Sequence, residues 1–295
     1  MNGAPWSLVQ FTSATDPSPV PGVEIDGAVR RLPGDWPLRM TDILDDWATW
    51  SARLRDLDLA GLAGVSAAVL HAPITYPRKV LCTGSNYFDH AKEMGSGTPS
   101  SAEEPFFFMK PPTTTIIGPG ATIPLPEGIE GRLDWEVELG VVIGKRCKNV
   151  SVEDALGVVA GYVVAVDVSA RALFARPDAA LLSFTYDWFR HKSLDGFCPT
   201  GPGLVPSWLV GDPGELDISL SVNGQMKQSS NTREQVIEVA GLIASASRYV
   251  TLEPGDLILT GTPAGVGMPR GEYLVAGDVL VAEIDGIGRL SNAVG

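Results

Sequence analysis

The chain has 295 residues, of which 44% are hydrophobic and 19% charged, a balance typical of a folded globular protein. Its net charge of −13 and the lack of any Lys/Arg-rich run exclude a nucleic-acid-binding surface. The unpaired cysteines Cys82, Cys147 and Cys198 and the missing signal-peptide pattern indicate a cytoplasmic protein without disulfides or a membrane segment.

Residues 1–77 are predicted to form a small N-terminal α+β lobe. Turn-forming residues dominate its start, and Asp26-Gly27 predicts a hairpin. A helix capped by Thr41 should follow, because apolar residues recur there at helical spacing: Ile43, Leu44, Trp47, Trp50, Leu54 and Leu57. The sequence HAPITYPRK, with two prolines, then indicates a linker.

Residues 78–295 are predicted to form the catalytic domain. Short strand-like runs alternate there with Gly/Pro turns: VLCTG, PFFFM, VELGVVIG, GYVVAVDV, LDISLSV, DLILTG and DVLVAEID. One helix interrupts them, TREQVIEVAGLIASASRYV, where Thr232 and Gln235 have the spacing of a capping box. The predicted fold class is therefore α+β and mostly β, with a few helices.

Glu136 and Glu138 lie two residues apart on the apolar segment DWEVELGVVIG. Side chains alternate faces along a strand, so both carboxylates should point to the same side. A solvated strand face would explain the pair. The apolar residues on both faces of the segment favour a buried strand instead, in which like charges need a neutralising partner such as a divalent cation.

Asp167 supplies a third carboxylate at the end of another apolar run, GYVVAVD. If the two runs are adjacent strands, Glu136, Glu138 and Asp167 meet at one point. Three carboxylates suit a hard cation, Mg²⁺ or Mn²⁺, with Ca²⁺ as a substitute in crystals. The sequence has no Cys/His cluster for zinc.

Two further segments carry candidate catalytic and binding residues. His90 and Glu93 lie three apart in GSNYFDHAKEMG, the spacing of a general-base pair on one helical turn and also of an ordinary surface pair. Lys192 has apolar neighbours, which indicates a desolvated amine or an anion contact where most lysines are solvated. Thr262 and the loop amides after it could bind a carboxylate.

Together these segments resemble the fumarylacetoacetate hydrolase family from about Lys79 to the C-terminus. The resemblance rests on seven motifs in the family's order: GSNYFDHAKEMG, FFFMKPPTTTIIGPG, LDWEVELGVVIGK, GYVVAVDVSAR, DWFRHKSLDGFCPTGP, VNGQMKQSSNT and LTGTPAGVG. It implies a mixed β-roll or sandwich core and a homodimer. It also implies metal ligands at Glu136, Glu138 and Asp167.

The same resemblance assigns roles to the other candidates. His90 and Glu93 fall on the family's dyad, on a lid segment that substrate orders, and Lys192 falls on its active-site lysine. Thr262 falls on its substrate-carboxylate threonine. We further expect substrate contacts from residues in these motifs, namely Asn86, Tyr87, Arg171 and Gly261.

Three positions depart from the family's pattern. Val166 stands where many members have Asn, Phe174 stands near a position often occupied by Gln, and His191 replaces the usual Gly before the lysine. These departures bear on the shape of the pocket and so on the substrate, and they leave the metal site as it is.

The favoured function is metal-dependent hydrolysis of a carbon–carbon bond in a 1,3-dicarbonyl acid of the acylpyruvate or fumarylpyruvate type. The same carboxylates could serve decarboxylation of an oxaloacetate-like acid, or isomerisation or dehydration of a 2-oxo acid in aromatic or sugar-acid catabolism. A non-catalytic metal-dependent binder is a further alternative, which needs neither the dyad nor the lysine. The expected partner is a small anionic 2-oxo or diketo acid, with no nucleic acid and no membrane.

Overall fold

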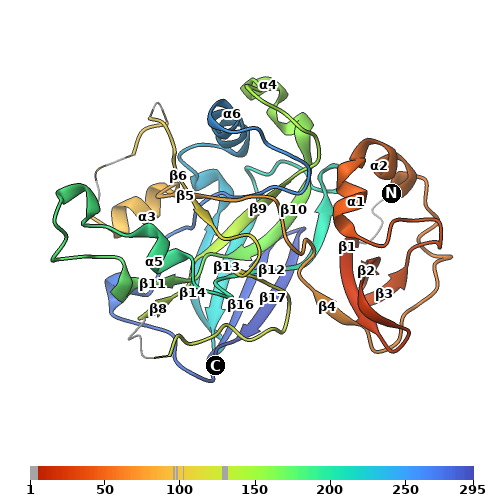
Figure 1. The fold of residues 1–295 in the computed structure, drawn as a ribbon, viewed down its shortest axis with the longest axis horizontal. Coiled ribbons are helices and arrows are strands. Elements are labelled where there is room, and N and C mark those ends of the chain that lie inside the picture. The colour runs from red at the N-terminus through yellow and green to blue at the C-terminus, as the bar shows by residue number, and fades with distance from the viewer. Residues whose placement is uncertain (1–5, 96, 98, 102, 128–131) are drawn as a thin grey trace.

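The computed structural model describes residues 6–95, 97, 99–101, 103–127 and 132–295. Within them the fold is α+β and mostly β, as the sequence predicts (Figure 1). An 11-stranded mixed sheet has the strand order β3-β2-β1-β12-β10-β9-β15-β5-β6, with β4 beside β1 and β7 beside β12. Most neighbours are antiparallel, whereas β15–β5 and β12–β7 are parallel.

The strands of this sheet run from the N-terminal lobe to the catalytic domain. They are β1 (Trp6–Ser13), β2 (Asp16–Ile25), β3 (Ala28–Arg31), β4 (Val69–His71), β5 (Val80–Gly84), β6 (Phe106–Lys110), β7 (Ile116–Ile117), β9 (Val137–Ile143), β10 (Val159–Val166), β12 (Cys198–Pro206) and β15 (Leu257–Leu259). The strands β9 and β10 lie in the middle of the sheet, and every one of their residues is buried. Their near-continuous apolar sequence follows from this burial on both faces.

A four-stranded sheet packs against the centre of the large one. It contains β14 (Gln225–Asn231), β13 (Asp217–Val222), β16 (Val279–Ile284) and β17 (Gly288–Ala293), in that order. Its apolar face and one face of β9 and β10 share a single hydrophobic core. A short pair, β8 (Leu133–Asp134) with β11 (Ser169–Ala170), lies beside the ends of β9 and β10.

The helices are short and lie around the sheets. They are α1 (Met40–Asp45), α2 (Trp47–Arg55), α3 (Phe88–Glu93), α4 (Val152–Ala155), α5 (Trp188–Lys192) and α6 (Val239–Tyr249). Single 3-10 turns occupy Leu156–Val158, Arg171–Leu173, Leu182–Phe184, Ser207–Leu209, Thr232–Glu234 and Met268–Arg270.

The predicted hairpin is confirmed, because Ile25 pairs with Ala28 across Asp26 and Gly27, both of which have positive φ. The predicted single helix with a Thr41 cap is wrong. Its sequence forms α1 and α2, separated at Asp46, where the backbone leaves the helical region, and α1 begins at Met40.

The capping box predicted for the helix after Thr232 is also wrong. The Thr232 hydroxyl accepts the N–H of Leu216 at 2.9 Å, and the Gln235 amide donates to the Thr260 hydroxyl at 2.9 Å. Both side chains are therefore used in tertiary contacts, and α6 begins only at Val239.

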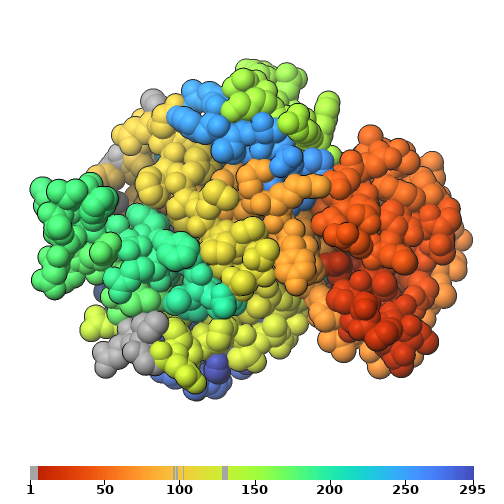
Figure 2. Space-filling model, in the orientation of Figure 1, coloured from red at the N-terminus to blue at the C-terminus, as the bar shows by residue number. Residues whose placement is uncertain are grey.

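The N-terminal lobe continues the catalytic sheet. Figure 2 shows it as the red and orange body on one side of the molecule. The strand β1 pairs with β12 at Leu8 and Leu204, and Leu8 belongs to the same apolar core as Val142 of β9. The boundary after residue 77 stays a prediction, since one sheet and one core cross it.

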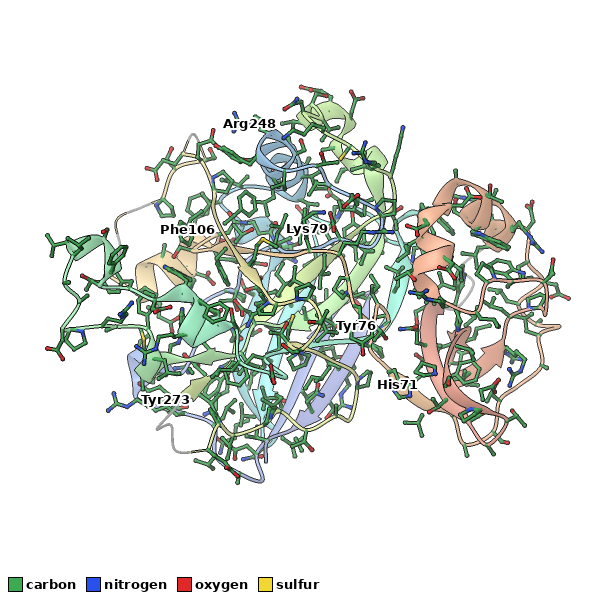
Figure 3. All side chains as sticks on the ribbon, viewed as in Figure 1. His71, Tyr76, Lys79, Phe106, Arg248 and Tyr273 are labelled. Atoms are coloured by element: carbon green, nitrogen blue, oxygen red, sulfur yellow. The ribbon has the colours of Figure 1, made fainter. Side chains whose placement is uncertain are left out.

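Ion pairs join the segments that surround the sheet. Lys79, labelled in Figure 3, lies 2.8 Å from Asp256 and 3.0 Å from Glu253, which links the start of β5 to the loop before β15. Arg248 of α6 pairs with Glu104 before β6. In the described part of the chain, no helix combines the length and the apolar character needed to cross a membrane.

Candidate functional site

Three carboxylates meet where β9 and β10 lie side by side. Glu138 pairs with Ala165 across the two strands, and Asp167, directly after β10, donates its backbone N–H to the carbonyl of Glu136 at 2.8 Å. One carboxylate oxygen of each of Glu136, Glu138 and Asp167 lies within 4.8 Å of the others, and all three residues are buried. The structure therefore brings together the three carboxylates that the sequence singles out.

Two cations neutralise Glu136. Lys192 Nζ lies 2.6 Å from Glu136 Oε2 and 2.6 Å from Asp167 Oδ2, and Arg171 Nη2 lies 2.5 Å from Glu136 Oε1. Burial raises the pKa of Glu136, but the charges of Lys192 and Arg171 outweigh it and hold that pKa well below its ordinary value. Arg171 is itself fixed by Asp134, 2.9 Å from its Nε.

Among the described residues, none forms an ion pair with Glu138. Burial and the charges of Asp167 and Glu136 raise the pKa of Glu138 well above its ordinary value. The N–H of Gly261 donates to its Oε2 at 2.6 Å. Gly261 has φ +93°, and a Cβ there would lie 2.8 Å from the Cβ of Asn86, so only glycine brings this amide so close without strain.

Lys110 binds the backbone of three segments that surround the site. It is not among the residues that the sequence singled out. Its side chain is fully buried, and its Nζ donates to the carbonyls of Lys192, Phe197 and Val168 at 2.5, 2.9 and 3.1 Å. Nζ also lies 2.7 Å from Asp167 Oδ1, but its three hydrogens are already directed at carbonyl oxygens. The sequence feature that could have indicated its burial is its place at the end of the apolar run FFFMK.

The donor set fits a divalent cation. Among the described residues, none gives the buried Asp167 Oδ1 a well-directed hydrogen bond. Burial, and after it the negative charges of Asp167 and Glu136, raise the pKa of Glu138. Three carboxylates are ligands that Mg²⁺ and Mn²⁺ take. Glu136, Glu138 and Asp167 thus form a site for such a cation, which would relieve the repulsion among them.

His90 and Glu93 lie on α3, which the structure places over the same cavity. His90 is buried, and its Nδ1 is 3.5 Å from Glu93 Oε2, a loose contact of the kind that tightens when substrate binds. Both oxygens of Glu93 accept the N–H of Gly265, at 3.1 and 3.0 Å. Although burial raises the pKa of Glu93, His90 and the Gly265 amide lower it below its ordinary value.

Of the residues predicted to contact substrate, some line the cavity and others do not. Arg171 and Thr262 line the cavity, although the Thr262 hydroxyl already donates to the carbonyl of Val137 at 2.9 Å. Asn86 and Tyr87 are buried away from the lining: the Asn86 amide bonds the backbone of Ile237 and Thr260, and the Tyr87 hydroxyl faces Gln235. These two side chains do not line the cavity in this structure, and their contact with substrate stays a prediction.

The cavity over the carboxylates has a volume of about 210 Å³. One end of it is charged, with Glu136, Glu138, Asp167, Arg171 and Lys192. The rest of the lining combines aromatic and sulfur-containing side chains with small or polar residues. They are Met94, Phe108, Phe174, Trp188 and Met268, and Thr83, Gly84, Ser85, His90, His191 and Thr262. The space suits a small acid, since it lies below the range of pockets for drug-sized ligands.

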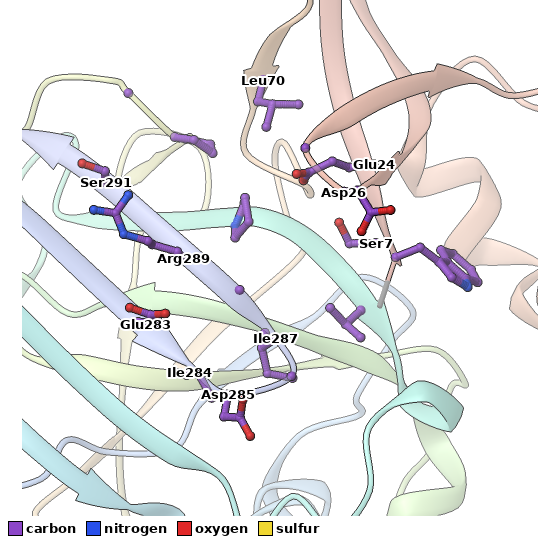
Figure 4. Close-up of a pocket in the computed structure, with 18 residues that line it drawn as sticks. Ser7, Glu24, Asp26, Leu70, Glu283, Ile284, Asp285, Ile287, Arg289 and Ser291 are labelled. Carbon is purple, nitrogen blue, oxygen red and sulfur yellow. The ribbon is translucent and has the colours of Figure 1, made fainter. Parts of the chain in front are cut away.

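A wider cavity of about 670 Å³ lies between the N-terminal lobe and the β16–β17 hairpin, shown in Figure 4. Ser7, Glu24 and Asp26 line it on one side and Glu283 and Arg289 on the other. It contains none of the three clustered carboxylates, so it is separate from the site described above.

Comparisons with known proteins show what this chain is similar to. The family model for the C-terminal domain of fumarylacetoacetate (FAA) hydrolase matches residues 79–295. Oxaloacetate tautomerase fahd2, mitochondrial, of Xenopus laevis is 42% identical over 296 residues, covering 97% of this chain and 89% of that protein. The 2,4-didehydro-3-deoxy-L-rhamnonate hydrolase of Sphingomonas sp. (strain SKA58) is 40% identical over 273 residues, covering 91% of this chain and 89% of that protein.

A solved structure is similar over nearly its whole length. Maleylpyruvate hydrolase from Sphingobium sp. SYK-6, in complex with manganese(II) ion and pyruvate, has a TM-score of 0.76 and 31% identity, with 98% of each chain covered. The complex shows that a protein of this fold holds a divalent cation together with a 2-oxo acid.

Proposed function

Because this chain is an enzyme of the fumarylacetoacetate hydrolase family, we propose that it hydrolyses the carbon–carbon bond of short acylpyruvates with the help of a divalent cation. One observation carries the proposal: a buried histidine with a carboxylate partner lines the same small cavity as the three clustered carboxylates. Cleavage of such a bond needs both a stabilised anion and an activated water.

The charged end of the cavity would bind the 2-oxo acid. When bound, the cation would neutralise the carboxylate end of the substrate and polarise its 2-oxo group. Lys192 and Arg171 place two further positive charges beside it. They would stabilise the negative charge that develops at the 2-oxo end as the carbon–carbon bond breaks.

His90 would activate the water. Its Nδ1 faces Glu93, so Nε2 is the nitrogen left to take a proton from water, which attacks the remote carbonyl of the acyl group. The hydroxyl of water ends on the acyl carbon, giving a carboxylic acid. The electron pair of the broken bond passes to the pyruvate fragment, which takes up the proton.

The aromatic part of the cavity lining favours an acyl chain that carries no charge. Phe108, Phe174 and Trp188 supply apolar surface there, and both cations that line the cavity, Arg171 and Lys192, already pair with carboxylates. A second carboxylate on the substrate would therefore lose its hydration without gaining a dedicated partner. A short uncharged chain fits this wall better.

A second candidate is tautomerisation of oxaloacetate, favoured by the 42% identity to the Xenopus laevis tautomerase over 97% of this chain. The same residues could perform it, since His90 would move a proton between carbon and oxygen without any water. Acylpyruvate hydrolysis consumes water and yields two acids, which separates the two reactions by their products.

The test is turnover of acetylpyruvate and of enol-oxaloacetate by the Mn²⁺-loaded and Mg²⁺-loaded protein. We expect acetylpyruvate to give pyruvate and acetate with a kcat/KM at least tenfold above that for ketonisation of oxaloacetate. Ketonisation without acetylpyruvate cleavage would refute hydrolysis and support the tautomerase. The homodimer and the cytoplasmic location remain parts of the proposal, and sedimentation velocity checks the first of them.

A further inference from the structure

Gln228 is a buried polar residue that the proposed reaction does not use. It lies in β14, within the motif VNGQMKQSSNT, and is 1% exposed. Its Oε1 accepts the N–H of Val137 at 3.0 Å, and its Nε2 donates to the Thr262 hydroxyl and to the carbonyl of Pro263, each at 2.8 Å. Because the oxygen and both N–H groups are used, the side-chain amide is held in one orientation.

Thr262 closes these contacts into a ring. Its hydroxyl accepts from Gln228 and donates to the carbonyl of Val137 at 2.9 Å. Gln228 therefore binds the N–H of Val137, Thr262 binds the carbonyl of the same residue, and the two side chains bind each other. All three residues are buried. We call this pair of side chains the Gln228–Thr262 clamp.

The clamp lies where β15 stops pairing with β9. The last paired residues of these two strands are Leu259 and Gly140. Further along β9, the carbonyl of Glu136 accepts the N–H of Asp167 on the β10 side. Successive residues of a strand direct their backbone groups to opposite sides, so the N–H and carbonyl of Val137 face the side that β15 no longer covers. Buried backbone groups need partners, and the clamp supplies them.

We propose that Gln228 and Thr262 are positioning residues that set the geometry of the cation site through Val137. This residue lies between Glu136 and Glu138. Its N–H belongs to the planar peptide unit that it shares with Glu136, and its carbonyl belongs to the unit that it shares with Glu138. The clamp holds both units, and thereby fixes the direction in which the two carboxylates point.

The clamp gives Thr262 a role other than the one that the family resemblance implies. A hydroxyl has one hydrogen, and that of Thr262 is directed at the carbonyl of Val137, so none is left to donate to a substrate carboxylate. Thr262 thus acts on the cation site through Val137. The inference depends on the cation site and not on the hydrolysis, since tautomerisation would use the same carboxylates.

The test is calorimetry of Mn²⁺ with the metal-free protein, without substrate. We expect Gln228→Met and Thr262→Val each to weaken Mn²⁺ binding by about tenfold or more, as is typical when a residue that orients metal ligands from outside is lost. Thr262→Ser keeps the hydroxyl and should keep most of the affinity. The double variant should lose little more than the weaker single variant, because both substitutions open the same ring.

Gln10→Met is the matched control. Gln10 is also a buried glutamine, and its Nε2 donates to the carbonyl of Ala72 at 2.8 Å and to the Thr75 hydroxyl at 2.7 Å. The variant loses the same kinds of hydrogen bond in the N-terminal lobe. Its thermal unfolding temperature should therefore fall, while its Mn²⁺ affinity stays at the wild-type value.

The EPR spectrum of bound Mn²⁺ is a second readout, because it reports the symmetry of the ligands. It should broaden in Gln228→Met and Thr262→Val and stay unchanged in Gln10→Met. Wild-type Mn²⁺ affinity in Gln228→Met, an equal loss in Gln10→Met, or additive losses in the double variant would overturn the inference. If Gln228→Met does not fold, Thr262→Val and Thr262→Ser decide the question.

Turnover of acetylpyruvate by the same variants separates failure of this inference from failure of the proposed hydrolysis. If the wild type does not cleave acetylpyruvate but the clamp variants lose Mn²⁺ affinity, the hydrolysis fails and the clamp stands. A raised KM in Thr262→Val with wild-type Mn²⁺ affinity would assign the hydroxyl to substrate binding, so that the hydrolysis stands and the clamp fails. A wild-type protein that binds no Mn²⁺ would overturn the clamp together with the cation site.

Discussion

The two ends of the catalytic cavity are built differently. At the charged end, Glu138 and Asp167 lie in or directly after β9 and β10, fully buried strands in the middle of a large sheet. At the acyl end, Phe174, Trp188 and His191 come from a segment of short turns between β11 and β12 that projects from the body of the molecule, seen in green in Figures 1 and 2.

This difference separates the chemistry from the choice of substrate. A buried strand holds a carboxylate rigidly, because moving it would disrupt the packing and hydrogen bonds of its neighbours. Loops tolerate substitution and insertion at small cost to stability. We therefore expect substitutions among the residues between Arg171 and Lys192 to change the shape of the pocket at small cost to stability, while Arg171 and Lys192 themselves belong to the charged end.

The largest effect should come from the charged end, in Glu138→Gln. Removing one carboxylate charge weakens the hold on a cation whose transition-state stabilisation amounts to several kcal/mol. We expect acylpyruvate cleavage to fall roughly 10³-fold or more. Mn²⁺ affinity, measured by calorimetry, should fall as well. Glu283→Gln, in the wider cavity, is the matched control and should leave Mn²⁺ affinity unchanged. Wild-type affinity in Glu138→Gln would remove Glu138 from the cation site.

His90→Ala tests the residue proposed as the general base, which lines the same cavity. Loss of a general base typically lowers a rate by roughly 10²- to 10⁴-fold, and we expect acetylpyruvate cleavage to fall by that factor. Mn²⁺ affinity should be preserved, because His90 is not one of the clustered carboxylates. Decarboxylation of oxaloacetate, where it occurs, should fall much less, since it needs no activated water.

Glu93→Gln should reproduce this loss more weakly, because it mis-orients the imidazole without deleting it. His71→Ala, which alters a histidine on β4 in the N-terminal lobe, is the control and should cleave at the wild-type rate. Cleavage by His90→Ala at the parent rate would refute the role of the dyad and favour an isomerase or decarboxylase.

Lys110→Met tests how far the charged end depends on its buried support. The substitution leaves Asp167 with one buried cation fewer and removes the donor to three carbonyl oxygens. Breaking a buried pair in this way costs about 3–5 kcal/mol. Denaturant unfolding should show this loss as a lower free energy of unfolding. Lys79→Met breaks a more exposed ion pair and should lower the free energy of unfolding clearly less. Equal losses in the two variants would contradict the supporting role.

The charged end was largely predictable from sequence, because its signals are local. Apolar residues on both faces of the segment around Glu136 and Glu138 indicate a buried strand, and a carboxylate at the end of the next apolar run indicates its partner. All seven predicted strand segments contain strands of the structure. Lys110 escaped prediction because its role depends on carbonyls 58 to 87 residues away in the sequence.

The wrong capping prediction at Gln235 and the unexpected contacts of Asn86 also arise from residues distant in the sequence. Gln235 has the spacing of a capping residue, yet Thr260 of another element takes its amide. Asn86 belongs to a motif next to the dyad, yet its amide ties the backbones of Ile237 and Thr260 together. The strands β12, β14 and β17 were also missed, since their sequences contain many Gly, Ser, Asn or Pro residues and lack a clear alternation.

The smallest predicted effect concerns α3, the helix that carries the dyad. We expect residues 88–101 to be mobile without ligand; of these, 96 and 98 lie outside the described residues. Glu93 holds α3 to the loop at Gly265 through two hydrogen bonds to one N–H. The folded protein lowers the pKa of this carboxyl, so the contact stabilises the fold only while Glu93 is ionised.

The sign of the pH dependence follows from that lowered pKa. The stabilisation is fully present above the ordinary glutamate pKa of about 4.3 and is lost as pH falls through the lower, folded value. Thermal unfolding should therefore show wild type slightly more stable than Glu93→Gln at pH 6, with the difference shrinking below about pH 4. Protection of the α3 amides from hydrogen exchange should shrink over the same range in wild type only. A stability difference that stays constant from neutral pH to acid would mean that the charge of Glu93 does not hold α3 in place.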